Sequence, residues 1–526
     1  MDNIKILDCT LRDGGYVNSW NFGENGISQT LHNLQISKID YVECGFLKDC
    51  EYNTDKTLFN RIEEINKFFP SANTKPDMVV AMIMFGQFSP GKLVPKSPDI
   101  ALDAIRVTFK KHEIDKAFKF LKKIQEFGYK VFVNPTNIDS YSDLEIIELL
   151  KKVNELNPYA FSIVDTKGIL KENDILRLYY LINTNLKQNI QLGFHSHNNL
   201  QLSFSNAQIL MKVCSKRELI IDSTVFGMGR GAGNLCTELL TQYINDNYNG
   251  TYNIIPILKI VDEFINPIFT QTPWGYSVPY YLAATNHCHP NYARYLVDKQ
   301  TVPVEIINDI LATLPNEKRT TYDENFIRQV YLDKFHSKIN DSNTLKYIQD
   351  EIKDKTILIL APGKSISSQK AEIDAFIKER NPFIFALNFL PENYKIDMVF
   401  ITNIKRFLSL EKTSIPVIIS SNISACGDNI KIINYSAYLN DSKMFDNVAL
   451  MLLKLLIKIG VKRVYFAGMD GFSNIPVENY FAENLVSLAK VSENENYNAI
   501  MKELFSKFRK NIEINFITKS LYGENE

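Results

Sequence analysis

The amino-acid sequence predicts an α/β protein in which a (β/α)8 barrel precedes a helical accessory region and a second α/β domain. Apolar, strand-like runs alternate with amphipathic stretches eight times before residue 265, and eight such units in about 250 residues are typical of a (β/α)8 barrel. Beyond a helical interval, apolar runs return in the last third of the chain. The length of 526 residues also favours two or three domains.

The runs in the first part of the chain are rich in Val, Ile and Phe, which is typical of parallel strands covered by helices. They occupy residues 4–9, 40–46, 78–84, 104–109, 130–135, 160–165, 190–195 and 219–227. Amphipathic stretches between them, such as 28–37, 112–128 and 141–157, predict the covering helices. A doubly wound open sheet is the alternative, but it would not place polar residues at so many strand ends.

After the barrel, the periodicity changes to that of helices and then back to alternation. Helical stretches at 280–299 and 303–315 predict an accessory region packed on the barrel, and a polar stretch over 335–355 leads to the second α/β domain. The predicted strands of that domain lie at 356–362, 382–389, 397–402, 416–421, 430–435 and 462–468, with a long helix over 446–460. The predicted domains are 1–265, 266–345 and 346–526.

Composition restricts the partners and the compartment. Lys and Arg total 59 against 60 Asp and Glu, a net charge of −1, which argues against nucleic acid or an anionic membrane as partner. Because MDNIKILDC has no basic region followed by a long apolar stretch, we expect no secretory signal. The longest apolar stretch, 449–460, is interrupted by lysines and predicts a buried amphipathic helix. Seven cysteines without a C-x-x-C pair indicate reduced thiols. We therefore expect a cytoplasmic protein with no nucleic-acid or membrane partner.

Polar residues gather at the predicted C-terminal ends of the barrel strands, where (β/α)8 enzymes carry their catalytic groups. These residues are Arg12 and Asp13 after the first strand, Glu43 on the second, Asp165 and Thr166 on the sixth, and His195 and His197 on the seventh. The eighth strand leads into GMGRGAGN, residues 227–234. Residue types of this kind, converging on one mouth, predict a catalytic site there.

The sequence His-Ser-His at 195–197 is the strongest local indication of chemistry. Residues two apart on a strand point to the same side, so both imidazoles can face one point. Two histidines and a carboxylate can hold a divalent ion with open positions for substrate, and Asp13 is the natural third ligand. Ligands without thiolate favour Mn²⁺ or Mg²⁺ over Fe²⁺, Co²⁺ or Zn²⁺. Two unrelated polar histidines are the alternative.

An ion at this place can chelate a 2-oxo acid and stabilise the enolate formed when a carbon–carbon bond is made or broken. Arg12, next to Asp13, can add a cationic donor to the same developing oxyanion. A salt bridge across the barrel, with Glu43 as partner, is the alternative role of Arg12, and both roles can hold at once.

Four separated motifs, found in order, resemble the DRE-TIM metallolyase superfamily, and they look most like its 4-hydroxy-2-oxovalerate aldolase branch. The motifs are TLRDGG, VECGF, SIVDTKG with GFHSHNNLQLSFSNA, and IDSTVFGMGRGAGN. The resemblance implies a TIM barrel that binds its metal through Asp13, His195 and His197. It further implies that Arg12 stabilises the enolate, that Glu43 belongs to the catalytic set and that Thr166 contacts the substrate carboxylate. Asn234 matches a metal-binding asparagine of the lyase branch.

One position departs from the pattern of the aldolase branch, because Tyr16 stands where that branch has a catalytic histidine. A phenol has a reference pKa near 10, against about 6.5 for imidazole, and is the poorer base at neutral pH. Tyr16 can act as an acid, hold a water molecule or only line the pocket. The aldolases also use a tyrosine that follows the barrel, for which Tyr276 and Tyr280 are candidates. For His287 and His289 we expect surface or packing roles.

The second α/β domain opens with TILILAPGKSI, residues 356–366, a strand, a turn and a helix start that can present N–H groups to a phosphate. A P-loop is absent because Leu358 replaces its first glycine, and G-x-G-x-x-G is absent too. Together with residues 460–474, the segment resembles the Rossmann-like domain of bacterial sialyltransferases and motility-associated proteins. That resemblance implies that Gly363, Ser365 and Asp470 face a nucleotide or nucleotide-sugar. A non-binding structural domain is the alternative.

The sequence as a whole predicts a metal-dependent aldolase or lyase that acts on a pyruvate-type 2-oxo acid and a carbonyl acceptor. The attached domain suggests a sugar or nucleotide-linked acceptor, as in surface-polysaccharide biosynthesis. Two alternatives stay open. One is an acyl-CoA-dependent Claisen-type synthase, and the other is a nucleotide-sugar-binding transferase whose barrel is regulatory. We also expect a homo-oligomer.

Overall fold

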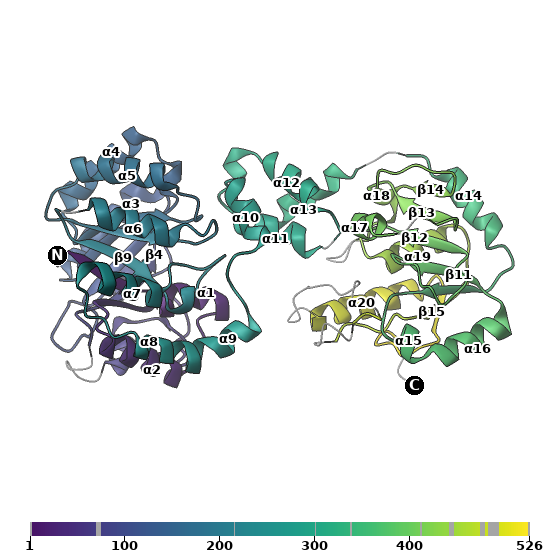
Figure 1. The fold of residues 1–526 in the computed structure, drawn as a ribbon, viewed down its shortest axis with the longest axis horizontal. Coiled ribbons are helices and arrows are strands. Elements are labelled where there is room, and N and C mark those ends of the chain that lie inside the picture. Colours follow the sequence, from purple (N-terminus) through teal and green to yellow (C-terminus); the bar gives the residue numbers. More distant parts are fainter. Residues whose placement is uncertain are drawn as a thin grey trace. The chain divides into compact units, whose positions relative to one another are not determined.

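The computed structural model divides the chain into two compact units, Met1–Pro290 and Asn291–Glu526 (Figure 1). The residues that it describes are 3–69, 75–214, 216–299, 301–336, 339–410, 413–440, 446–473, 479–481 and 494–523. The division falls inside the predicted helical region, so α10 (Val278–Thr285) belongs to the first unit, whereas α12 (Val304–Ala312) and α13 (Glu324–Lys334) belong to the second. The three-domain division read from the sequence stays a prediction.

The first unit is a closed barrel of eight parallel strands. The strands are β1 (Ile4–Asp8), β2 (Tyr41–Leu47), β4 (Met78–Met84), β5 (Ala104–Phe109), β6 (Lys130–Pro135), β7 (Ala160–Asp165), β8 (Gln191–Ser196) and β9 (Leu219–Ser223). Strand β1 pairs with both β9 and β2, which closes the barrel. A short strand, β3 (Leu58–Phe59), adds to β2 outside the ring. The predicted (β/α)8 barrel is thereby confirmed.

The eighth strand is shorter than its apolar run suggested. It ends at Ser223, and residues Val225–Gly227 form a 3-10 turn in which Phe226 adopts a left-handed φ of 55°. The turn brings the following glycine-rich loop back over the barrel mouth, because the N–H of Asn234 donates to the carbonyl of Gly227 at 3.0 Å.

Helices follow the strands of the barrel and surround it (Figure 1). They include α1 (Gly15–Asn18), α2 (Glu24–Ile36), α3 (Ile114–Glu126), α4 (Asp143–Leu156), α5 (Glu172–Asn185), α6 (Ser203–Val213), α7 (Thr237–Tyr248), α8 (Ile255–Ile260) and α9 (Asn266–Gln271). Helix α3 buries Ala117, Phe120, Leu121 and Ile124, a spacing of three and four that keeps one face against the strands. Ser142 caps the N-terminus of α4, and its hydroxyl accepts the N–H of Glu145 at 3.3 Å.

The barrel interior has an apolar floor and a charged upper layer. The floor is a cluster of buried residues from the strands and from Cys9, just after β1: Leu7, Cys9, Tyr41, Met78, Val80, Ala104, Phe132, Ala160 and Ile220. Arg106, Glu43 and Asp222 lie buried farther along the same strands, toward their C-terminal ends. The strands therefore carry a charged layer directly beneath the barrel mouth.

The second unit contains a seven-stranded parallel sheet in the order β14-β13-β12-β11-β10-β15-β16. Its strands are β10 (Ile357–Leu360), β11 (Phe383–Leu387), β12 (Met398–Ile401), β13 (Val417–Ser420), β14 (Ile430–Ile433), β15 (Arg463–Ala467) and β16 (Glu513–Phe516). Six of them were predicted, whereas β16 was not, because its sequence EINF is short and half polar. The order along the sheet reverses once, between β10 and β15.

Helices of the second unit include α14 (Ser342–Glu351), α16 (Lys370–Arg380), α19 (Val448–Lys458) and α20 (Asn494–Phe508), together with α11 (Pro290–Asp298) after its first residue. Helix α19 buries most of its side chains, as predicted from its apolar sequence. In the described part of the chain, no helix combines the length and the apolar character needed to cross a membrane.

Candidate active site

The segment after β1 forms a single π-helical turn, Thr10–Gly14, that is entirely buried. Two side-chain bonds fix its backbone: the hydroxyl of Thr57 donates to the carbonyl of Leu11 at 2.6 Å, and the indole N–H of Trp20 donates to that of Arg12 at 2.8 Å. A Cβ atom at Gly15 would lie 2.0 Å from the Trp20 ring, so only glycine fits there. The turn therefore holds Arg12 and Asp13 rigidly at the strand end.

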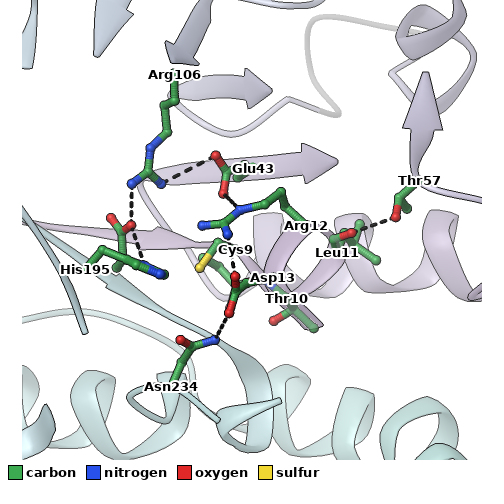
Figure 2. A network of polar contacts seen from close by, with 12 residues as sticks. Cys9, Thr10, Leu11, Arg12, Asp13, Glu43, Thr57, Arg106, His195 and Asn234 are labelled. Atoms are coloured by element: carbon green, nitrogen blue, oxygen red, sulfur yellow. Dashed lines mark hydrogen bonds and ion pairs between the residues drawn. The ribbon is translucent and has the colours of Figure 1, made fainter. Parts of the chain in front are cut away.

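The three predicted metal ligands meet at the barrel mouth. Asp13, His195 and His197 are buried, and one ligand atom of each lies within 4.8 Å of those of the other two. The two imidazole rings, two residues apart at the end of β8, have centroids 5.2 Å apart. The distance from His197 Nδ1 to Asp13 Oδ2 is 3.9 Å. Figure 2 shows Asp13 and His195 within one network of polar contacts.

Asn234 joins this group from the loop after β9. Its side-chain amide donates to Asp13 Oδ2 at 2.6 Å, and its backbone bridges to His197. Among the described residues, no group donates to the buried Asn234 Oδ1, and none pairs by hydrogen bonding with the buried His197 Nδ1. Both atoms can ligate a cation, so the donor set fits a divalent ion in character and in number.

Protonation states in the cluster also suit a cation. Burial opposes the charge on Asp13, but the Arg12 guanidinium and the two imidazoles hold the pKa of this carboxyl well below its usual range. Burial lowers the pKa of His197 to about 4. At neutral pH, Asp13 is therefore ionised and His197 neutral, which are the forms that bind metals.

The pKa of His197 predicts that the stability of the metal-free protein depends on pH. An unfolded histidine protonates near pH 6.5, whereas folded His197 does so near 4, so the unfolded chain binds more protons between these values. This contribution to the free energy of unfolding is complete above pH 6.5 and is lost as the pH falls towards 4, by up to ~1.4 kcal/mol per pH unit. In denaturant titrations, the free energy of unfolding should fall less between pH 7 and pH 5 in His197→Gln than in the wild type. An identical loss would contradict the assignment.

A second group of possible ligands, Cys9, His195 and Asp222, lies within the same mutual distance but is less suited to a cation. Burial raises the pKa of the Cys9 thiol well above its usual range, and the thiol donates to the carbonyl of Ser223 at 3.4 Å. Asp222 is ion-paired with Arg106. The first group, with its ionised carboxylate and neutral imidazole, is the better metal centre.

A buried network of charges supports the cluster from below (Figure 2). Arg12 is ion-paired with Asp13, and its Nε donates to Glu43 Oε2 at 2.6 Å. The other carboxylate oxygen of Glu43 lies 3.5 Å from Arg106 Nη1, and Arg106 is ion-paired with Asp222 through its second terminal nitrogen. The predicted pairing of Arg12 with Glu43 is thus present. Glu43 contacts two arginines rather than one.

The network ends at His195, whose Nδ1 lies 3.0 Å from Asp222 Oδ2. Burial opposes the charge on Asp222, but Arg106 and His195 lower the pKa of this carboxyl. A carboxylate close to one ring nitrogen is typical of histidines that bind a metal through the other nitrogen. Arg106 and Asp222 were missed by the sequence reasoning. An arginine in the apolar run AIRVTF and an aspartate in LIIDS were the available signals.

Thr166 and Asp165 follow β7. The Thr166 hydroxyl accepts the N–H of Asn137 at 2.8 Å, and its predicted contact with a substrate carboxylate stays a prediction. The carboxylate of Asp165 accepts the N–H groups of Ile169 at 3.0 Å and Leu170 at 3.1 Å. Burial raises the pKa of Asp165 to about 7. Asp165 therefore shapes the turn that carries Thr166.

Tyr16 lies at the rim, with 37% of its surface exposed. Its ring packs edge-on against Trp20 and Phe46, with centroid distances of 4.8 Å and 6.2 Å. Burial of the hydroxyl, and then the negative charge of Asp13, raise the pKa of Tyr16. The phenol is consequently protonated at neutral pH and can give a proton rather than take one.

The other residues singled out after the barrel lie in different surroundings. Tyr276 is exposed and packs against Tyr281, with ring centroids 6.4 Å apart. His287 is exposed and has a left-handed φ of 52°. The imidazole of His289 is hydrogen-bonded to Arg230, which follows β9 in the glycine-rich loop.

In the second unit, the three predicted nucleotide-facing residues come together where the strand order reverses. The N–H of Gly363 donates to the carbonyl of Gly468 at 2.8 Å. The N–H of Ser365 donates to Asp470 Oδ2 at 2.8 Å, and the Ser365 hydroxyl bonds to the other carboxylate oxygen. The Asp470 carboxylate thus accepts hydrogen bonds from the same Ser365 groups that could otherwise bind a phosphate.

Fold and site define the first unit as a (β/α)8 barrel with a buried Asp-His-His cluster able to bind a cation at its mouth. Residues 3–251 match the HMGL-like family model, a stretch that covers the barrel and slightly less than half of the chain. The comparison therefore agrees with the barrel resemblance noted in the sequence.

Individual relatives match about half of the chain. A 4-hydroxy-2-oxovalerate aldolase of Geobacillus genomosp. 3 is 22% identical over 266 residues, covering 50% of this chain and 77% of the relative. An oxaloacetate decarboxylase of Mycobacterium tuberculosis is 21% identical over 284 residues, covering 52% and 79%. Among solved structures, the HMG-CoA lyase of Bacillus subtilis is 13% identical with a TM-score of 0.40, covering 51% of this chain and 93% of that one. The strand pairings described above, and not this last similarity, establish the fold.

Proposed function

We propose that this protein is a divalent-metal-dependent carbon–carbon lyase, an aldolase that acts through the enolate of a pyruvate-type 2-oxo acid. The observation that carries the proposal is the buried cluster of Asp13, His195 and His197 directly beside the Arg12–Glu43 ion pair. The aldolase and decarboxylase names of the relatives support the same chemistry. We propose Mn²⁺ or Mg²⁺ as the metal, because the donors are carboxylate and imidazole without thiolate.

Asp13, His195 and His197 would hold the ion, with Asn234 Oδ1 as a further donor. When bound, the ion supplies positive charge that stabilises the enolate of the 2-oxo acid. The protein itself contributes an ionised carboxylate and a neutral imidazole, both buried, where electrostatic interactions are strong.

Arg12 is the donor to the substrate. Its Nε and Nη1 are engaged by Glu43 and Asp13, whereas its buried Nη2 has no hydrogen-bond partner among the described residues. We assign this nitrogen to an oxygen of the 2-oxo acid, on which negative charge grows during the reaction. Glu43 holds the guanidinium in place and is itself held by Arg106. Thr166, at the end of β7, is the proposed contact of the substrate carboxylate.

In the cleavage direction, the C4 hydroxyl of a 4-hydroxy-2-oxo acid loses a proton to solvent and the C3–C4 bond breaks. C3 then gains a proton from Tyr16, which takes one back from solvent. An aldehyde and the 2-oxo acid are released. Tyr16 is protonated at neutral pH, and we assign to it the donation of a proton rather than the role of base.

The proposed activity is tested by incubating the Mn²⁺-loaded protein with 4-hydroxy-2-oxopentanoate and measuring pyruvate release. We expect turnover that disappears on chelation with EDTA and returns with Mn²⁺. Exchange of the C3 protons of pyruvate with deuterated solvent, followed by NMR, reports enolate formation without any acceptor. Protein that contains metal but neither cleaves a 4-hydroxy-2-oxo acid nor exchanges these protons would overturn the proposal.

For the second unit we propose a role in binding a nucleotide or nucleotide-sugar. Gly363, Ser365 and Asp470 lie at a reversal of strand order, which is where open parallel sheets bind ligands. Because Asp470 is a carboxylate, the contact we propose is with sugar hydroxyls of a nucleotide or nucleotide-sugar. We propose that this ligand is the acceptor of the aldolase reaction and that the pathway is surface-polysaccharide biosynthesis. Calorimetric titration of the whole chain and of Asp470→Asn with nucleotide-sugars tests it. The cytoplasmic location and the homo-oligomeric state stay predictions.

A further inference from the structure

The loop that follows β9 brings an arginine to the rim of the metal cluster. Gly229 lies so close to the cluster that a Cβ atom there would be 2.9 Å from Asp13 Oδ2 and 2.2 Å from Asn234 Nδ2. Glycine at this position allows the backbone to pass directly over the ligand carboxylate. The next residue, Arg230, is half-buried, and its Cζ lies 5.9 Å from the centroid of the Tyr16 ring. Arg230 therefore stands beside the predicted proton donor.

Arg230 is held by a neutral partner. One terminal nitrogen of its guanidinium is hydrogen-bonded to the ring Nε2 of His289. Burial and the neighbouring Arg230 lower the pKa of His289 to about 3, so this imidazole is uncharged at neutral pH and accepts the bond. The hydrogen bond fixes the direction of the guanidinium without neutralising its charge.

The arginines of the site differ in their counter-ions. Arg12 is ion-paired with Asp13 and Glu43, and Arg106 with Glu43 and Asp222. Within the part of the chain that the structure describes, no carboxylate lies within ion-pair distance of Arg230. A half-buried cation without a counter-ion is costly, since its hydration is only partly replaced. An anion from outside the protein would supply the missing charge.

Building on the aldolase activity proposed above, we propose that Arg230 binds an anionic group, a carboxylate or a phosphate, on the acceptor half of the substrate. In the proposed reaction, Arg12 and the metal cluster already bind the charged oxygens of the 2-oxo acid half. Arg230 lies against the ring of Tyr16, which is partly exposed, so a group that reaches it extends outward from the reacting carbons. A guanidinium fork matches both carboxylate and phosphate oxygens.

The test compares three 4-hydroxy-2-oxo acids on the Mn²⁺-loaded full chain: one with a neutral alkyl end, one ending in a carboxylate and one ending in a phosphate ester. We expect kcat/KM to be about 10- to 100-fold higher for one of the anionic substrates than for the neutral one, the range expected for a charge-assisted hydrogen bond. The preferred substrate identifies the anion. In Arg230→Gln this ratio should fall to near one, mainly through a higher KM, and Arg230→Lys should keep part of it.

Arg177→Gln is the matched control, because Arg177 is an exposed arginine paired with Asp143 on the outside of the barrel. It should leave the preference unchanged. A wild-type protein with no preference for either anion, or an Arg230→Gln variant that keeps the full preference, would overturn the role of Arg230. The failure of the aldolase proposal is distinguishable, because the wild type would then not exchange the C3 protons of pyruvate at all.

Discussion

Replacement of Asp13 by asparagine should remove the metal and reduce turnover by about 1,000-fold or more, since the ion is expected to provide several kcal/mol of stabilisation to the developing charge. Asparagine keeps the size of the side chain but not its charge. Arg12 would still have Glu43 as an ionic partner, so the fold should survive the change. Metal content by mass spectrometry and pyruvate release measure the two effects.

His195→Ala, which removes a second proposed ligand of the same ion, should likewise cause the loss of both the metal and the turnover. His287→Ala is the matched control, because it removes an exposed imidazole. Circular dichroism would show whether each variant retains its secondary structure. If Asp13→Asn and His195→Ala both kept stoichiometric metal, the cluster of Asp13, His195 and His197 would not be the metal centre.

Arg106→Met is expected to have the largest effect on stability, lowering the free energy of unfolding of the barrel by about 3–5 kcal/mol. Arg106 is 1% exposed and pairs with both Glu43 and Asp222. Methionine replaces the volume of the side chain but leaves these two buried carboxylates without their shared cation. Denaturant unfolding, followed by a signal from the barrel, measures the change.

Arg177→Met is the corresponding control on the surface, where Arg177 and Asp143 are both substantially exposed. An exposed pair of this kind contributes at most about 1 kcal/mol. Arg106→Met should also weaken metal binding by about 10- to 100-fold, because Asp222 would no longer be held against His195. Equal stability losses in the two variants would show that the buried network does not stabilise the barrel.

Much of the barrel, and the meeting of Asp13, His195 and His197 in a candidate metal cluster, could be predicted from local patterns. Eight apolar runs separated by amphipathic stretches determine strands, helices and hence the barrel. The spacing of His195 and His197 places both on one side of a strand, and their position at a strand end points them to the mouth. Asp13 could be added because the ends of parallel strands converge. Each of these inferences needs only a few neighbouring residues.

The charged layer beneath the cluster could not be predicted in the same way. Arg106 and Asp222 are 116 residues apart in sequence, and they meet only because the barrel closes and its register brings both to one level. An isolated charge in a strand gives no indication of its partner. Similarly, the hydrogen bond between Arg230 and His289 depends on how the segment after the barrel returns to the mouth.

The sequence by itself determined the fold class of the barrel, through periodicities of two and 3.6 residues, and it predicted the three candidate ligands from their places at strand ends. Tertiary structure alone decided which charges neutralise each other. It pairs Arg12 and Arg106 with buried carboxylates and leaves Arg230 with a neutral imidazole. The physical reason is that electrostatic energy depends on distances through space, which closure of the barrel sets between residues far apart in the chain.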